Sequence, residues 1–222
     1  MNRAAVPERS TTATGLVSGL YAVTPEERDT DALAEKVRQA LAGGARIVQY
    51  RNKSADRALR VKQAAALAVL CRSAAVPLVI NDDLELALQI DADGLHVGRG
   101  DVDIARARKG LGEKKILGAS CYDSVDRAVA ASSLGADYVA FGSIFPSTTK
   151  PGASRAPLSL FDRARERVRV PIVAIGGITP ENASSVIDAG ADSIAVISAL
   201  FDATDIAATA RSFEHLFRRK SP

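Results

Sequence analysis

Eight short apolar segments recur along the 222-residue chain, and stretches of helical character separate them. Each segment is about as long as a β-strand and is rich in Val, Ile, Leu or aromatic residues. Apolar and polar residues do not alternate within them, which predicts strands buried on both faces, as in a parallel sheet. The segments are residues 20–24, 46–51, 77–82, 94–98, 116–121, 138–143, 171–177 and 193–198.

The stretches between these segments have the spacing of amphipathic helices. Thr179 followed by Pro180 predicts a helix start with Thr179 as its N-cap, and Gly190 predicts the end of that helix. Apolar residues recur at intervals of four or seven at Leu33, Val37, Leu41, Leu59, Ala66, Leu70, Val125 and Val129.

A weak internal repeat precedes four of the apolar segments. In "GGARIVQY", "DADGLHVG", "LGADYVAF" and "AGADSIAV" a small, turn-forming triplet leads into an apolar segment. Eight βα units in about 200 residues predict a single closed (βα)8 barrel, a TIM barrel. A doubly wound open sheet is the alternative, but it would need a G-x-G-x-x-G turn that "YAVTPEERD" lacks. We expect the barrel over residues 19–218, a flexible extension over 1–18 and a tail over 219–222.

Composition excludes several classes of function. The net charge is only +3, and the basic clusters at 163–170 and 217–220 are typical of solvated helix faces rather than nucleic-acid contacts. Cys71 and Cys121 have neither CxxC nor zinc-site spacing, which indicates reduced thiols. Residues 1–16 lack the apolar core of a secretory signal, and no apolar run is long enough to span a membrane. We therefore expect a cytoplasmic protein.

In a (βα)8 barrel the functional site lies at the carboxyl ends of the strands, so we expect the functional residues there. Gln49, Arg51 and Lys53 follow one another at alternate positions and share one side if the strand continues to Lys53. Arg and Lys also decorate strand ends without a function. Gln49, however, is a polar side chain where a barrel interior expects apolar filling, and this favours a binding site.

The next two strands end in carboxylates. In "LVINDD", Asp83 fits the N-cap of the following helix, which leaves Asp82 available for a ligand. Asp101 follows the neighbouring strand, and the two carboxylates together suit Mg²⁺. Asp101 could instead cap the helix after it. His96 is expected to be a hydrogen-bonded core histidine rather than a catalyst.

Later strand ends predict anion binding. Ser120 is expected to bind substrate, because no residue spacing supports a nucleophile. The loop "FPSTTKPG" offers three hydroxyls and Lys150, which suits an anion, although a solvated turn is the alternative. The glycines of "AIGGITPEN" and the end of the eighth strand suit a phosphate. Two phosphorylated groups and a metal predict the departure of a metal-bound diphosphate.

The sequence resembles the thiamine-phosphate synthase family. The resemblance runs from Tyr21 to about Phe213 and rests on "VQYRNK", "VINDD", "GLHVGRGD", "LGAS", "FGSIFPSTTK", "VAIGGIT" and "AVIS" in that order. It implies a (βα)8 barrel that joins hydroxymethylpyrimidine diphosphate to hydroxyethylthiazole phosphate and releases diphosphate. The implied mechanism is dissociative: diphosphate leaves, and the thiazole nitrogen captures the pyrimidine-methyl cation.

The resemblance also implies roles for individual residues. Asp82 and Asp101 match the Mg²⁺ ligands, and Lys53, Ser120 and Lys150 are expected to act in catalysis. The implied contacts of the pyrimidine diphosphate are Gln49, Arg51, Lys53, Asn81, Ser120 and Lys150. Those of the thiazole phosphate are Ser147, Thr148, Thr149, Gly177, Ile197 and Ser198. The chain has Arg99 where the family often has Gln, and Ser147 where it often has Thr.

Two other functions compete with this interpretation. A related thiazole tautomerase would bind thiazole phosphate without diphosphate or metal, and a non-catalytic barrel would only bind a phosphorylated ligand. Both would have no need of a metal pair facing a leaving group. Retention of Lys53, Asn81, Asp82, Asp101 and Lys150 therefore favours the synthase.

Overall fold

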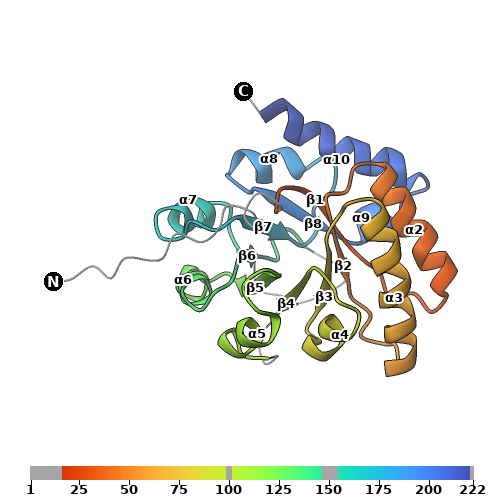
Figure 1. Ribbon diagram of the computed structural model, residues 1–222. Helices are drawn as coiled ribbons and strands as arrows, with labels where there is room; N and C mark the ends of the chain where they lie inside the picture. Colours follow the sequence, from red (N-terminus) through yellow and green to blue (C-terminus); the bar gives the residue numbers. More distant parts are fainter. Residues whose placement is uncertain (1–16, 99–101, 147–154, 221–222) are drawn as a thin grey trace.

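The computed structural model describes residues 17–98, 102–146 and 155–220 (Figure 1). Within them, eight parallel strands close into a barrel in sequence order, because β1 pairs with both β2 and β8. This pairing confirms the predicted (βα)8 barrel and excludes the open sheet. The strands are β1 Gly19–Val23, β2 Ile47–Tyr50, β3 Leu78–Asn81, β4 Gly94–Val97, β5 Ile116–Tyr122, β6 Tyr138–Phe141, β7 Ile172–Ile175 and β8 Ser193–Val196.

The helices lie around the outside of the barrel (Figure 1). A short extra helix, α9, follows β8 directly, and α10 then packs beside α2, α8 and β1. The helices are α2 Thr30–Ala42, α3 Arg57–Ser73, α4 Leu84–Gln89, α5 Ile104–Leu111, α6 Val125–Ser133, α7 Leu160–Arg165, α8 Ala183–Asp188, α9 Ser198–Phe201 and α10 Ile206–Lys220. None of the described helices is long and apolar enough to cross a membrane.

Two helix predictions were wrong in detail. The predicted face of α3, which included Leu59 and Ala66, is only partly buried, and the helix instead buries the face of Leu67 and Cys71. Helix α8 begins at Ala183 rather than after Thr179, because residues 179–182 form a turn in which the Asn182 side chain accepts a hydrogen bond from the Thr179 amide. Local apolar spacing does not show which of two neighbouring helix faces meets the barrel.

The described part of the chain bears only in part on the expected domain limits. The extension over residues 1–16 lies outside the described residues, and Val17 is already buried in the barrel interior. At the other end α10 continues to Lys220, beyond the expected limit of 218. The last helix is therefore part of the packed domain for almost all of its length.

The barrel is filled by two separate apolar clusters. The larger cluster lies between the strands and the helices, and the smaller one fills the barrel interior. The interior contains two fully buried tyrosines, Tyr21 and Tyr138, whose rings meet edge to face with centroids 5.9 Å apart. Gly118 on β5 makes room for them, since a Cβ atom there would lie 2.0 Å from Cζ of Tyr138. The other interior residues are Val17, Val23, Ile47, Val79, Ile116, Ala140, Val173 and Ala195.

We expect Gly118→Ala to lower the free energy of unfolding by about 1–3 kcal/mol, because the rigid Tyr138 ring must move within a packed interior. Urea denaturation measures the change. Gly110→Ala on α5 is the matched control, since its Cβ would meet only the end of the Leu84 side chain, at 3.0 Å. Equal unfolding midpoints for the two variants would contradict the tight fit at Gly118.

Carboxylates at the other end of the barrel explain the internal repeat. In three of the four repeats the residue immediately before the strand is an aspartate. Its Oδ2 accepts a hydrogen bond from a backbone amide of the preceding, neighbouring strand. Asp93 accepts from the Leu78 amide at 2.9 Å, Asp137 from Leu117 at 2.8 Å and Asp192 from Ile172 at 2.6 Å.

Glu214 supplies the same contact for β1. The first repeat has Arg46 at the position of the aspartates, and a carboxylate from α10 takes their place. Glu214 Oε1 accepts from the Leu20 amide at 2.7 Å, and Arg46 Nε donates to its Oε2 at 2.9 Å. β3, β5, β7 and β1 therefore each have an amide near their start satisfied by a carboxylate.

Candidate active site

A pocket of about 660 Å³ opens at the carboxyl ends of the strands. Every predicted site residue that the structure describes lines this pocket: Gln49, Arg51, Lys53, Asn81, Asp82, Ser120, Gly177, Ile197 and Ser198. The remaining predicted site residues lie outside the described residues: Asp101, Ser147, Thr148, Thr149 and Lys150. Nine side chains or backbone positions that are far apart in sequence are thus brought to one site.

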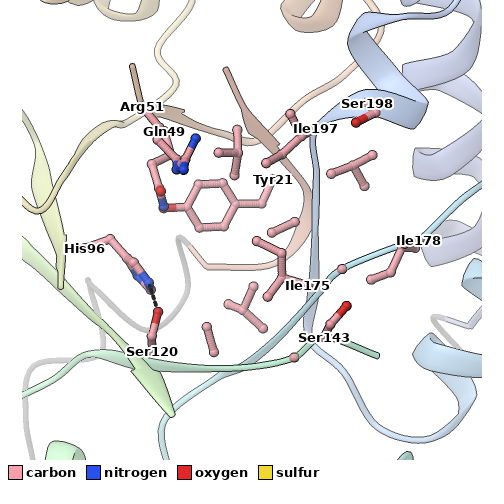
Figure 2. Close-up of a pocket in the computed structure, with 18 of the residues that line it drawn as sticks. Tyr21, Gln49, Arg51, His96, Ser120, Ser143, Ile175, Ile178, Ile197 and Ser198 are labelled. Atoms are coloured by element: carbon pink, nitrogen blue, oxygen red, sulfur yellow. Dashed lines mark hydrogen bonds between the residues drawn. The ribbon is translucent and has the colours of Figure 1, made fainter. Parts of the chain in front are cut away.

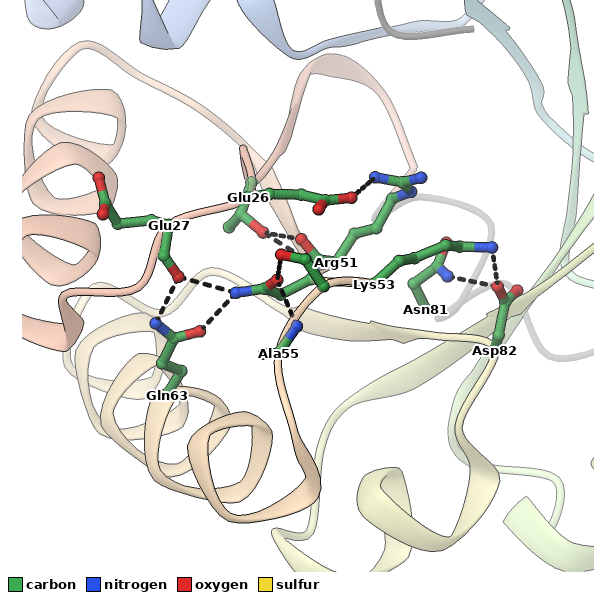
Figure 3. Close-up of polar contacts among 11 residues, drawn as sticks. Glu26, Glu27, Arg51, Lys53, Ala55, Gln63, Asn81 and Asp82 are labelled. Carbon is green, nitrogen blue, oxygen red and sulfur yellow. Dashed lines mark hydrogen bonds and ion pairs between the residues drawn. The ribbon is translucent and has the colours of Figure 1, made fainter.

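The segment after β2 is held rigidly at the pocket. β2 ends at Tyr50, so Arg51 and Lys53 reach the pocket from a loop rather than from a continued strand. Asn52 fixes this loop: its amide group donates to the Glu27 carbonyl at 2.8 Å and to Gln63 Oε1 at 3.1 Å (Figure 3). Asn52 was not among the predicted site residues, although it stands within "QYRNK".

Arg51 carries a positive charge to the rim of the pocket. Its backbone amide donates to Thr24 Oγ1 at 2.9 Å, and its guanidinium pairs with Glu26 at 3.2 Å (Figure 3). A hydrogen bond with Ser54 and the nearby charge of Arg51 lower the pKa of Glu26. The β1–α2 loop therefore helps to orient the Arg51 side chain.

Asp82 leaves the end of β3 in an uncommon backbone conformation. Its φ is +64°, in the left-handed region that Asp tolerates better than most residues, and its amide donates to the His96 carbonyl at 2.8 Å. The carboxylate accepts from Asn81 Nδ2 at 2.6 Å and pairs with Lys53 Nζ at 3.0 Å (Figure 3). The backbone turn thus directs an ionised group toward the pocket.

Asp83 has the separate structural role predicted for it. Its Oδ1 accepts from the Leu86 amide at 2.9 Å and so caps α4. Its Oδ2 pairs with Arg57 at 2.7 Å and with Arg60 at 3.4 Å. The three polar residues at the end of β3 are therefore divided between the pocket, which Asn81 and Asp82 line, and the helix.

A chain of hydrogen bonds crosses the floor of the pocket, and we call it the interior relay. Gln49 Nε2 donates to the Tyr21 hydroxyl at 2.9 Å, and the Tyr21 and Tyr138 hydroxyls are 2.8 Å apart. His96 Nδ1 lies 2.8 Å from the Tyr138 hydroxyl, and His96 Nε2 lies 2.9 Å from Ser120 Oγ (Figure 2). His96 is buried with both ring nitrogens hydrogen-bonded, as predicted for a core histidine, but it also contacts the site.

The glycines after β7 are required by the protein's own packing. Gly176 and Gly177 have φ values of +103° and +64°. A Cβ on Gly177 would lie 2.2 Å from the Pro146 carbonyl oxygen, and one on Gly176 would lie 2.1 Å from Ser143 Oγ. The segment after β6 thus occupies the space that the sequence interpretation gave to a ligand, although both glycines still line the pocket.

The wall opposite His96 and Ser120 is formed by the end of β8 (Figure 2). Ile197 precedes α9, and its carbonyl accepts hydrogen bonds from the amides of Leu200 and Phe201. Ser198 begins α9. In (βα)8 barrels a phosphate often binds where the loops after strands 7 and 8 meet a short extra helix.

The described residues bear on the predicted metal site only through Asp82. Among them, no group of three or more His, Cys, Asp or Glu side chains is placed to hold a metal ion. The other role considered for Asp101, capping of the following helix, belongs to Asp103, whose side chain accepts from the Arg106 amide at 3.1 Å. An Mg²⁺ site at Asp82 and Asp101 stays a prediction.

Sequence reasoning missed Tyr21, Tyr138 and Ser143 as pocket residues. A signal for the tyrosines exists, because each stands at an inward-facing position of its strand and carries a hydroxyl that needs a partner when buried. Only the closed barrel shows that the two hydroxyls, 117 residues apart, meet each other.

The fold and the site together define a class of protein. An eight-stranded parallel barrel with a pocket at the carboxyl ends of its strands has the architecture of (βα)8-barrel enzymes. Residues 20–200 match the family model described as thiamine monophosphate synthase. The chain belongs to this thiamine monophosphate synthase family.

Individual relatives agree with the family model. The thiamine-phosphate synthase of Aromatoleum aromaticum is 54% identical over 199 residues, which cover 90% of this chain and 96% of the relative. That of Methylobacillus flagellatus is 56% identical over 201 residues, with 90% and 96% covered. Among solved structures, thiamine phosphate pyrophosphorylase from Pyrococcus furiosus superimposes with a TM-score of 0.83 at 33% identity, covering 94% of this chain and 98% of that one.

Proposed function

We propose that this protein joins hydroxymethylpyrimidine diphosphate to hydroxyethylthiazole phosphate in its pocket, forming thiamine phosphate and releasing diphosphate. This is the reaction of its family. The observation that carries the proposal is the arrangement of the pocket, with cations and carboxylate after β2 and β3 and a phosphate-type site after β7 and β8. Two phosphorylated substrates fit such a pocket with their organic rings between the two charged ends.

The pyrimidine diphosphate occupies the end formed by β2 and β3. Arg51 and Lys53 supply positive charge for the diphosphate, and Asn81 supplies an amide. Asp82 is a hard oxygen donor at the pocket wall, which fits Mg²⁺, and Asp101 would be its partner. Bound Mg²⁺ would supply Lewis-acid stabilisation of the leaving diphosphate.

Besides the metal ion, the Lys53 side chain can assist cleavage of the bond to the diphosphate. A unit charge pair at 4 Å contributes about 4 kcal/mol at an effective dielectric of 20. Lys53 Nζ, which is 3.0 Å from Asp82, lies where negative charge grows on the diphosphate as it departs. We assign Lys150 the same role from the sequence. This chemistry needs no protein nucleophile.

The thiazole phosphate occupies the opposite end. Ile197 and Ser198 stand at the start of α9, and Gly177 also lines the pocket. Backbone amides at this place suit a phosphate. The hydroxyls of Ser147, Thr148 and Thr149, which lie outside the described residues, would complete the contact.

The test combines both substrates with Mg²⁺ and measures thiamine phosphate and diphosphate. We expect the two products in equal amounts, and none when either substrate is left out or when a chelator is in excess. Undiminished turnover in excess chelator would overturn the role of the metal. Conversion of a thiazole phosphate tautomer, with no diphosphate released, would instead establish the tautomerase alternative.

A further inference from the structure

The interior relay joins β2 to β5 through the middle of the barrel. Its members, in order, are Gln49, Tyr21, Tyr138, His96 and Ser120, and each contact is 2.8 or 2.9 Å long. All five members line the pocket, but the first four are buried and Ser120 is the most exposed of them. Such a connected set of buried polar groups gives each member a defined partner.

Packing holds the relay in place. The Tyr138 ring stacks on the His96 ring with centroids 5.5 Å apart and an interplanar angle of 22°. Tyr21 meets Tyr138 edge to face, and Gly118 leaves the space that the Tyr138 ring fills. Close packing therefore holds the two tyrosine rings and the imidazole ring in place, and with them the hydroxyls and ring nitrogens of the relay.

The relay has a direction, which begins at Gln49. Gln49 Nε2 can only donate, so the Tyr21 oxygen accepts and the Tyr21 hydrogen points to Tyr138. In this direction the Tyr138 hydrogen points to His96 Nδ1, whose role as the acceptor is set by the tautomer of the ring. A neutral imidazole that accepts at Nδ1 carries its hydrogen on Nε2, and this hydrogen is donated to Ser120 Oγ.

The relay transmits orientation and not charge. Burial raises the pKa of the Tyr21 and Tyr138 hydroxyls above the ordinary value for tyrosine, so both stay protonated at neutral pH. Each hydroxyl therefore always donates one hydrogen bond. The direction of each hydrogen bond in the relay determines the direction of the next one.

We propose that Tyr21, Tyr138 and His96 are positioning residues that turn the Ser120 hydroxyl hydrogen into the pocket, so that Ser120 meets substrate as a hydrogen-bond donor. The assignment of a pyrimidine ring nitrogen as the acceptor of this hydrogen bond rests on the proposed function. A ring nitrogen offers a lone pair, whereas a ring edge with a C–H group would leave the donor unpaired. Such a mismatch discriminates strongly between ligands.

The first test measures the tautomer of His96 by ¹⁵N NMR in the substrate-free protein. The chain has two histidines, and His215 lies exposed on α10, so His215→Gln leaves the His96 signal alone. We expect hydrogen on Nε2 and an unprotonated Nδ1. Hydrogen on Nδ1 would mean that the relay runs the other way, and it would overturn the proposal.

The second test reverses the relay from its far end. An ionised Glu side chain at position 49 has no hydrogen to donate, so it can act only as an acceptor. Ionisation of the new carboxylate in Gln49→Glu should therefore reverse every hydrogen bond of the relay and move the His96 hydrogen from Nε2 to Nδ1. Gln89→Glu on α4 is the control, because Gln89 is exposed and already accepts from Arg57. A His96 tautomer that ignores the charge at position 49 would show that no orientation is transmitted.

The third test separates positioning from stability. Tyr138→Phe cuts the relay, and we expect the KM for the pyrimidine diphosphate to rise about tenfold while that for the thiazole phosphate stays unchanged. Tyr50→Phe controls for the loss of a buried hydroxyl, since Tyr50 donates to Gln63 at 2.9 Å outside the relay. Equal rises of both KM values would overturn the proposal. Absence of product with the wild-type protein would refute the proposed reaction, while the NMR measurements would still test the relay.

Discussion

Asp82→Ala is expected to lower kcat by at least about 100-fold, because under the proposed function Asp82 holds the cations that would stabilise the negative charge of the departing diphosphate. The loss has two sources. The predicted metal site loses a ligand, and Lys53 Nζ loses the carboxylate 3.0 Å away that holds it at the pocket. Steady-state kinetics with both substrates at saturation and Mg²⁺ in excess measure the effect.

Asp83→Ala provides a control at the neighbouring position. This side chain caps α4 and pairs with Arg57 and Arg60, so its loss should cost about 1 kcal/mol of stability and leave kcat within a few-fold. Thermal unfolding reports the stability of both variants. If the two replacements lowered kcat equally, Asp82 would have only a structural role.

Asp137→Ala is expected to have the largest effect on stability, a loss of about 3–5 kcal/mol in the free energy of unfolding. Its carboxylate pairs with Arg108, and the two side chains are only 8% and 7% exposed. Without it, the guanidinium charge stays buried with three backbone carbonyls as its remaining partners, and the Leu117 amide loses its acceptor. Urea denaturation measures the loss.

The matched control is Asp126→Ala. Asp126 also pairs with an arginine, Arg167, but their side chains are 83% and 50% exposed. Water and salt screen such a pair, and its removal should cost less than about 1 kcal/mol. Similar losses in the two variants would show that burial of the Asp137 pair is not what matters.

The fold could be predicted from the sequence because the parallel barrel leaves a clear pattern. Each strand is buried on both faces and reads as a continuous apolar run, and eight such runs with helices between them have few alternative arrangements. Polar residues at the strand ends were equally visible. Gln49 and Asp82 interrupt or follow apolar runs, where a purely structural sequence would continue with apolar residues or a simple turn.

The rest of the site depends on distances that one sequence does not contain. The contact between Tyr21 and Tyr138 arises from the register of strands on different sides of the barrel. The need for glycine at 176 and 177 arises from a neighbouring loop rather than from a ligand. The N-cap role of Asp83, by contrast, was predicted, but alternation along β3 does not account for the pocket, because the adjacent residues Asn81 and Asp82 both line it. Asp82 lies beyond the end of the strand and has a positive φ.

The contact between Glu214 and the Leu20 amide links residues 194 positions apart, near the two ends of the chain. β1 also needs β8 to complete its hydrogen bonds, so its outer edge stays open until both β8 and α10 have been synthesised. During synthesis, therefore, β1 emerges well before its last partners in β8 and α10. During that interval β1 has an unpaired edge, and an edge of this kind can pair with another chain.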